Sequence, residues 1–191
     1  MKKIITIIVL IATLISFDSK AQESYGNTLN LGAGFGYYGY VGRSLPVLHA
    51  NYELAVAKNF TLAPFITLYS YSNQYYWGNG NKNYPYRYYS YRETVIPVGL
   101  KATYYLDDLL RANSKWDFYL GASLGFAFRS VSWDGDYYGD RYAYHNNNRP
   151  FVNLHAGAEY HVSSKLGLLL DLSSGVSTVG IAIHQGGSAK K

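Results

Sequence analysis

The chain has 191 residues, of which 48% are hydrophobic, 17% aromatic and 15% charged, and it contains no cysteine. The charged fraction lies below the roughly 25% of a soluble domain, and the apolar content excludes a disordered chain. Without cysteine, the chain forms no disulfide, no thiolate metal site and no lipid-modified cysteine anchor. The net charge of +5 is mild and scattered, which argues against a nucleic-acid partner.

The N-terminus has the pattern of a secretory signal peptide. Two lysines precede an apolar run from Ile4 to Phe17, which is too short to span a bilayer as a helix. Ser19-Lys20-Ala21 follows, with the small-x-small pattern of a cleavage site. We therefore predict a signal peptide over residues 1–21 and a single domain over residues 22–191.

Eight later segments alternate apolar and polar residues with a period of two, which is the pattern of β-strands. Helical periodicity is confined to residues 107–113, one or two turns at most. The sequence thus predicts an all-β domain. The predicted strands are, in chain order, residues 29–38, 48–56, 60–70, 91–106, 118–132, 152–162, 165–172 and 177–184.

The connections between these strands alternate in length. Those at 57–59 and 163–164 are tight and the one at 107–117 is moderate, whereas those after the first, third and fifth strands are long and rich in Gly, Asn and Tyr. Only the last, at 173–176, breaks the pattern by being short. Short turns at one rim and long loops at the other are typical of an outer-membrane barrel, and an even strand number places both termini at the short-turn, periplasmic rim.

The two faces of the predicted strands differ in composition. In residues 118–132, Phe118, Leu120, Leu124 and Phe126 share one face, whereas Gly, Ser and Ala dominate the other. Small residues fit the crowded interior of a narrow barrel, while a water-facing glycine would weaken a strand without any gain. We therefore expect the apolar face to meet lipid and the small-residue face to line the lumen.

Aromatic residues lie near the ends of the predicted strands, where membrane barrels carry aromatic girdles. The residues expected in these girdles are Tyr37, Tyr38, Tyr52, Tyr69, Tyr104, Tyr105, Trp116 and Trp133.

The signal peptide, the eight strands, the glycine-rich face and the alternating connections resemble the small outer-membrane β-barrel family that includes the OmpA transmembrane domain and OmpX-like proteins. The resemblance covers essentially the whole mature chain and rests on pattern rather than on a catalytic motif. It implies an eight-stranded antiparallel up-and-down transmembrane β-barrel in the outer membrane of a Gram-negative-type bacterium. Outer-membrane lipid and the barrel-assembly machinery are the partners it implies, with no cofactor.

Eight strands enclose an interior just wide enough for side chains, so charges inside it must be paired. Counting residues from the turns places Lys101 between the carboxylates of Glu53 and Glu159, and pairs Arg129 with Glu93 nearer the outer rim. We expect these charges to form ion pairs that fill and stabilise the barrel core. The alternative, which the OmpA-like resemblance suggests, is an ion-pair gate across a narrow pore. The predicted lumen network comprises Glu53, Lys101, Glu159, Glu93, Arg129, Asp171 and His155.

Three short motifs suggest other chemistry. The G-x-G-x-x-G at 34–39 lacks a following helix, and the acidic residues at 134, 136 and 140 lack the glutamate that completes a calcium loop. His161-Val162-Ser163 resembles the His-x-Ser of outer-membrane lipid A deacylases, but we expect it at the periplasmic rim, away from the outer leaflet. A lipid-modifying enzyme stays a second alternative; we predict neither a catalytic residue nor a metal site.

The long loops are unusually rich in tyrosine, which offers a flat apolar face and a hydroxyl at low entropic cost. We therefore predict a non-enzymatic envelope protein whose loops contribute to adhesion or bind an extracellular glycan or protein. In the other interpretation, these residues extend the strands and anchor at the lipid headgroups. The candidate contact surface comprises Tyr75, Tyr76, Trp77, Tyr86, Tyr88, Tyr137, Tyr138 and Tyr142.

Overall fold

The computed structural model describes residues 27–36, 43–44, 47–77, 87–110, 115–133 and 148–185. The predicted signal peptide lies outside these residues. Within the described ranges, no helix has the length and apolarity needed to cross a membrane.

Each of the eight predicted segments forms a strand. The elements are β1 (Asn27–Gly36), β2 (Arg43–Ser44), β3 (Val47–Ala57), β4 (Phe60–Trp77), β5 (Arg87–Tyr105), α2 (Asp107–Leu110), β6 (Trp116–Trp133), β7 (Arg149–His161), β8 (Leu166–Ser173) and β9 (Val176–Gln185). The two-residue β2, which was not predicted, pairs with β4.

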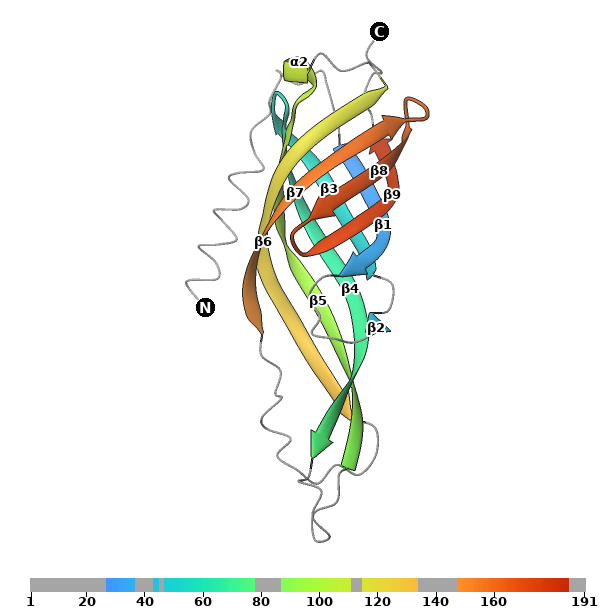
Figure 1. The fold of residues 1–191 in the computed structure, drawn as a ribbon. Coiled ribbons are helices and arrows are strands. Elements are labelled where there is room, and N and C mark those ends of the chain that lie inside the picture. The colour runs from blue at the N-terminus through green and yellow to red at the C-terminus, as the bar shows by residue number, and fades with distance from the viewer. Residues whose placement is uncertain are drawn as a thin grey trace, which may run out of the picture.

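The sheet closes on itself into a barrel (Figure 1). Hydrogen-bonded neighbours follow the order β4-β3-β1-β9-β8-β7-β6-β5, and β5 pairs back with β4. Every pairing around this ring is antiparallel. The predicted eight-stranded antiparallel up-and-down barrel is therefore confirmed, and its closure leaves no unpaired strand edge in the ring.

The two ends of the barrel carry different connections. One end, which we call the turn end, holds α2 and the tight β3–β4 and β7–β8 connections. Asn59 lies in the β3–β4 turn with φ 59°, in the left-handed region that Asn tolerates. Asn27 pairs with Gln185 at this end, so the first and last barrel strands meet there. The opposite end, the loop end, holds the connections that follow β1, β4, β6 and β8.

The barrel wall has uneven height at the loop end. The β4–β5 ladder continues to the pair Trp77–Arg87, and the β5–β6 ladder to Tyr91–Trp133. By contrast, β1 ends at Gly36 and β8 at Ser173. Strands β4, β5 and β6 therefore project well beyond the rest of the barrel and form what we call the tall wall (Figure 1).

Two glycines on the inner face allow β5 and β6 to approach closely. Gly99 and Gly125 are paired across the ladder, and a Cβ on either would lie 2.1 Å and 2.0 Å, respectively, from the nearest carbonyl oxygen of the neighbouring strand. No larger residue fits such an approach, and glycine kinks of this kind supply the curvature that closes a narrow barrel. These glycines thus make room for backbone rather than for side chains.

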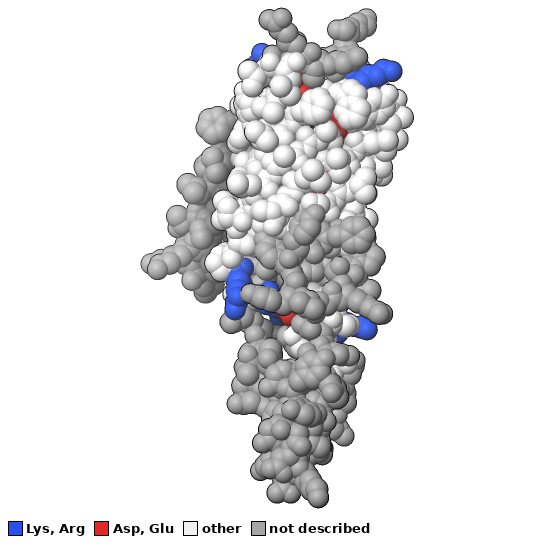
Figure 2. Space-filling model, viewed as in Figure 1, with Lys and Arg blue, Asp and Glu red and all other residues white. Residues whose placement is uncertain are grey.

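The apolar face of the strands points outward, as the alternation predicts. Leu124, Val152 and Leu154 are 63%, 74% and 68% exposed, whereas the intervening Ser123 and Asn153 are buried in the lumen. Figure 2 shows the result as a largely uncharged band, with Lys and Arg at its borders. This distribution is the reverse of that in a water-soluble barrel and is the surface of a transmembrane barrel.

Two of the residues expected in the aromatic girdle lie inside the barrel instead. Tyr69 and Tyr105 are each 5% exposed, whereas Tyr104 and Trp116 are exposed on the outer face. The reason is parity, because Tyr105 shares its face with the buried Lys101. Position near a strand end predicted the girdle, but the alternation decides which face each aromatic residue occupies.

Candidate functional site in the lumen

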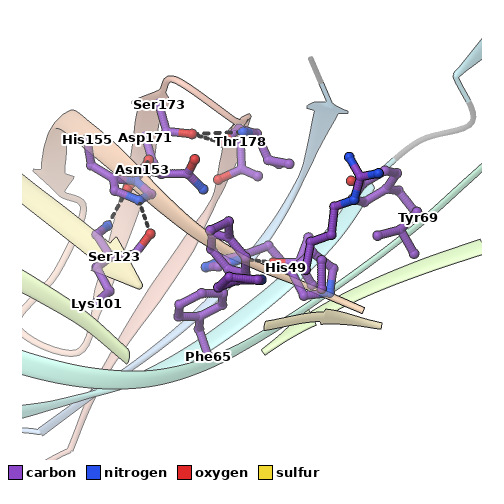
Figure 3. Close-up of a pocket in the computed structure, with 18 of the residues that line it drawn as sticks. His49, Phe65, Tyr69, Lys101, Ser123, Asn153, His155, Asp171, Ser173 and Thr178 are labelled. Atoms are coloured by element: carbon purple, nitrogen blue, oxygen red, sulfur yellow. Dashed lines mark hydrogen bonds and ion pairs between the residues drawn. The ribbon is translucent and has the colours of Figure 1, made fainter. Parts of the chain in front are cut away.

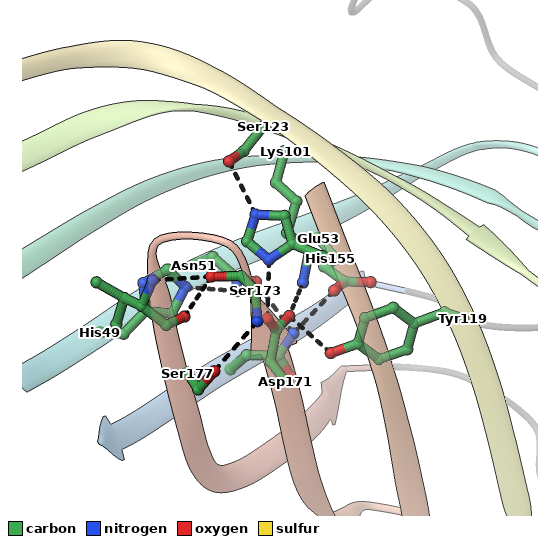
Figure 4. A network of polar contacts seen from close by, with 12 residues as sticks. His49, Asn51, Glu53, Lys101, Tyr119, Ser123, His155, Asp171, Ser173 and Ser177 are labelled. Atoms are coloured by element: carbon green, nitrogen blue, oxygen red, sulfur yellow. Dashed lines mark hydrogen bonds and ion pairs between the residues drawn. The ribbon is translucent and has the colours of Figure 1, made fainter. Parts of the chain in front are cut away.

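An ion pair between Lys101 of β5 and Asp171 of β8 crosses the lumen (Figure 4). Two strands, β6 and β7, lie between β5 and β8 around the ring, so the pair reaches across the barrel. Lys101 is 2% exposed, and its Nζ contacts Asp171 Oδ2 and lies 4.6 Å from the centre of the Tyr119 ring. The Tyr119 hydroxyl donates to the same carboxylate oxygen at 2.8 Å. The charge of Lys101 is therefore compensated although the side chain is buried.

The second oxygen of Asp171 continues the network toward β7 and β6. His155 Nδ1 lies 2.8 Å from Asp171 Oδ1, and Ser123 Oγ lies 2.8 Å from His155 Nε2. Asp171 thus accepts from three side chains, which fixes its orientation and that of Lys101.

Glu53 of β3 is held by neutral donors. Its carboxylate accepts hydrogen bonds from Asn30 Nδ2 at 2.9 Å, Thr61 Oγ1 at 3.0 Å and the Tyr105 hydroxyl at 2.7 Å. Glu53 is 2% exposed, so these three donors take the place of water around its charge.

The predicted layer with Lys101 between Glu53 and Glu159 is wrong. Lys101 pairs with Asp171, Glu53 with neutral donors, and Glu159 with His184 Nε2 at 2.7 Å. Counting residues from each turn ignored the stagger that closure imposes on tilted strands, so equal counts do not mean equal heights or facing side chains. Asp171 and His155, which the sequence placed in the lumen network without assigned partners, lie at its centre.

Arg129 and Glu93 form an ion pair on the tall wall. Arg129 Nη1 lies 3.0 Å from Glu93 Oε1, and the two side chains are 29% and 9% exposed. They come from neighbouring strands β6 and β5, closer to the loop end than the Lys101–Asp171 pair.

A cavity of about 200 Å³ lies between this ion pair and the Lys101 network (Figure 3). Lys101, Arg129 and Arg149 contribute cationic groups to its lining, against the single carboxylate of Asp171. Phe65 and Phe151 supply part of its apolar wall, and their rings lie 6.1 Å apart. Such a combination of apolar walls and a few charged groups is typical of a small ligand site.

Several polar residues of this lumen were not predicted as site residues. Five of them share the parity of a predicted charge on the same strand, and the other three face inward on strands without a predicted charge. In both cases the position opposite the apolar face was the signal that would have found them. The residues missed are Asn30, His49, Asn51, Thr61, Tyr105, Tyr119, Ser123 and His184.

The His-x-Ser motif lies at the turn end. His161 Nε2 is 2.7 Å from Asp117 Oδ2, which is the pairing of a base with its orienting carboxylate. Ser163 Oγ instead accepts from the backbone N–H of Leu166 at 3.1 Å, so it caps the β7–β8 turn. The serine of this motif is therefore engaged in the turn and makes no contact with the histidine that the structure describes.

The predicted contact surface is only partly within the described residues. Tyr75, Tyr76, Trp77 and Tyr88 belong to the projecting β4–β5 hairpin, where Tyr76 pairs with Tyr88 along the backbone. Tyr86, Tyr137, Tyr138 and Tyr142 lie outside the described residues, as do the acidic residues at 134, 136 and 140.

In strand number, closure and outward apolar face, the chain resembles small outer-membrane barrels. No protein-family model and no curated protein matches the sequence. Solved structures that match include a de novo designed transmembrane β-barrel (15% identity, 85% of this chain and 97% of that chain, TM-score 0.48). Neisserial surface protein A (18%, 83% and 94%, 0.45) and the attachment invasion locus protein Ail of Yersinia pestis (10%, 83% and 98%, 0.43) also match.

Proposed function

We propose that this protein is a non-enzymatic barrel of a bacterial outer membrane, with a structural role in the envelope. The apolar band of the closed barrel carries this proposal. Large side chains such as Leu124, Phe126 and Leu154 are more than half exposed on the outer face, where lipid would cover them. The lumen, by contrast, holds buried ion pairs and hydrogen bonds, which suits a barrel fastened from within.

The orientation follows from the two ends. Outer-membrane barrels place short turns in the periplasm and long loops outside the cell, so the turn end faces the periplasm and the loop end the exterior. The tall wall then projects from the membrane and carries Tyr75, Tyr76 and Tyr88 near the far end of the described β4–β5 ladder. A hairpin already ordered by its backbone ladder loses little entropy on binding, which favours it as an adhesive surface for an extracellular glycan or protein.

Heat modifiability tests the barrel. The refolded protein in detergent is run on SDS gels with and without boiling. We expect two mobilities, because a closed barrel resists SDS until it is heated. A protein that stays soluble without detergent and shows one mobility would mean that the apolar face is not a lipid surface.

A binding comparison tests the adhesive surface. Proteoliposomes carrying the barrel are applied to an array of immobilised oligosaccharides and extracellular proteins. We expect binding that falls at least tenfold when Tyr75, Tyr76 and Tyr88 are changed together to Ser. The matched control is Tyr104→Ser, an exposed tyrosine near the opposite end. Equal binding by both variants would remove the hairpin from the proposal and leave the envelope role.

A further inference from the structure

Three side chains with metal-binding atoms meet inside the barrel near the turn end. Glu159 and His161 lie two residues apart on the inner face of β7, and His184 comes from β9. One ligand atom of each lies within 4.8 Å of the other two. Glu159 Oε1 is 2.7 Å from His184 Nε2 and 3.7 Å from His161 Nδ1.

A glycine on the intervening strand makes this meeting possible. Gly167 of β8 is paired with His161 across the β7–β8 ladder, and β8 separates β7 from β9. A Cβ on Gly167 would lie 1.9 Å from Glu159 Oε1. The carboxylate of Glu159 therefore occupies the space that any other residue at 167 would fill, and through that space it reaches His184.

Both histidines are oriented by contacts on their other ring nitrogen. His161 Nε2 lies 2.7 Å from Asp117 Oδ2, and His184 Nδ1 lies 3.0 Å from Thr28 Oγ1. His161 Nδ1 and His184 Nε2 are thereby left directed at Glu159. Histidine ligands of metals in proteins have this arrangement, in which the second nitrogen is held by a carboxylate or another polar group.

We propose that Glu159, His161 and His184 bind a divalent transition-metal ion, with Zn²⁺ as the representative ion. Two imidazoles and one carboxylate are a ligand set that Zn²⁺ takes, and imidazole disfavours Ca²⁺ and Mg²⁺. In a tetrahedral site with bonds of about 2.0–2.1 Å, ligand atoms lie about 3.3 Å apart. The two separations from Glu159 Oε1, 2.7 and 3.7 Å, lie on either side of that value, and the two histidine nitrogens lie within 4.8 Å of each other, so shifts of these side chains would complete the site.

The ion has a route to this site from the turn end. The side chains of Glu159 and His184 are 4% and 9% exposed, but that of His161 is 23% exposed. When the ion binds, neutral His184 would carry its proton on Nδ1 and donate it to Thr28 Oγ1, which frees Nε2 for the ion, and water would complete the coordination. The ion would also tie β7 to β9, and the orienting contacts extend this link to β6 and β1.

Zinc binding to the refolded barrel in detergent tests the proposal, after treatment with a chelator and its removal. We expect calorimetry to show one Zn²⁺ per barrel and the urea midpoint to rise with Zn²⁺ concentration, because an ion that binds only the folded state stabilises it. Co²⁺ bound at the same site should give the strong visible absorption of a tetrahedral complex. Ca²⁺ should give neither signal.

Variants assign the ligands. His161→Gln should weaken Zn²⁺ binding at least 100-fold, and Gly167→Ala should weaken it by displacing Glu159. Asp117→Asn should weaken it by about 10–100-fold, as expected for an orienting partner. The matched control is His49→Gln, another lumen histidine, which bonds to Thr67 at 2.7 Å and should bind Zn²⁺ as the parent does.

Two results would overturn the proposal. One is the absence of any Zn²⁺-dependent change in the urea midpoint of the parent protein, which needs no variant to fold. The other is Zn²⁺ binding that is reduced equally by His161→Gln and His49→Gln, because binding would then not belong to this cluster. Neither result bears on the proposed adhesive role of the hairpin.

Discussion

The two halves of the lumen, on either side of the Lys101–Asp171 pair, are filled in different ways. Toward the turn end, Tyr105 and Tyr119 fill the space, with ring centres 5.8 Å apart, and their hydroxyls bind Glu53 and Asp171. Toward the loop end lies the cavity of about 200 Å³. A buried cluster that includes Val47, Tyr69 and Val95 also lies in the loop half, so the two halves differ in that space remains beside this cluster and not between the two tyrosine rings.

The comparison implies that substitutions in the turn half lower the free energy of unfolding more than substitutions in the wall of the loop-half cavity. A buried polar network penalises the loss of any member, because the remaining partners are left buried without a compensating group. A cavity wall can change its side chains with little effect on its neighbours. Three substitutions measure this difference.

Lys101→Ala should have the largest effect. It leaves the carboxylate of Asp171 without its cation, and breaking a buried pair in this way costs about 3–5 kcal/mol. The free energy of unfolding by urea in detergent measures the loss. Lys165→Ala, at an exposed turn position, is the control and should be neutral. An unchanged urea midpoint for Lys101→Ala would show that the pair does not fasten the barrel.

Gly157→Ala should have an intermediate effect, because it overpacks the turn half. The new Cβ would lie 2.1 Å from Tyr119 Cζ and would push the hydroxyl away from Asp171. Overpacking of this kind costs about 1–3 kcal/mol. The same urea titration measures it, with the outward-facing Ala156→Ser as the control. Equal stability of the two variants would contradict tight packing between Gly157 and Tyr119.

Ala127→Val should have the smallest effect. Ala127 packs against the buried cluster of Val47, Tyr69 and Val95 and also lines the cavity, into which the added methyl groups can extend. We expect a change in the free energy of unfolding below about 1 kcal/mol, within the range of tolerated substitutions. A loss as large as that of Gly157→Ala would mean that the loop half is packed as tightly as the turn half.

The sequence predicted the strands and the lipid-facing side, because both follow from local alternation, and the resemblance to small outer-membrane barrels implied the closure. It also paired Arg129 with Glu93, which lie on adjacent strands. It did not predict that Lys101 pairs with Asp171, since these residues meet across the barrel and their contact depends on strand tilt and stagger. Glu159 and His184 were missed as partners because β8 lies between their strands, and they meet only where Gly167 has no side chain.

Asn27 pairs with Gln185, so the first and last strands of the barrel are neighbours and the ring of strands is continuous. The strands follow one another around this ring in chain order. Their order would therefore be unchanged if a short linker joined the first strand to the last and the chain were cut at another connection. The β3–β4 turn at Lys58-Asn59 offers such a cut, because it lies at the same end of the barrel. A circular permutant opened there keeps every ladder of the ring, and its covalent ends lie on β4 and β3 instead of on β1 and β9.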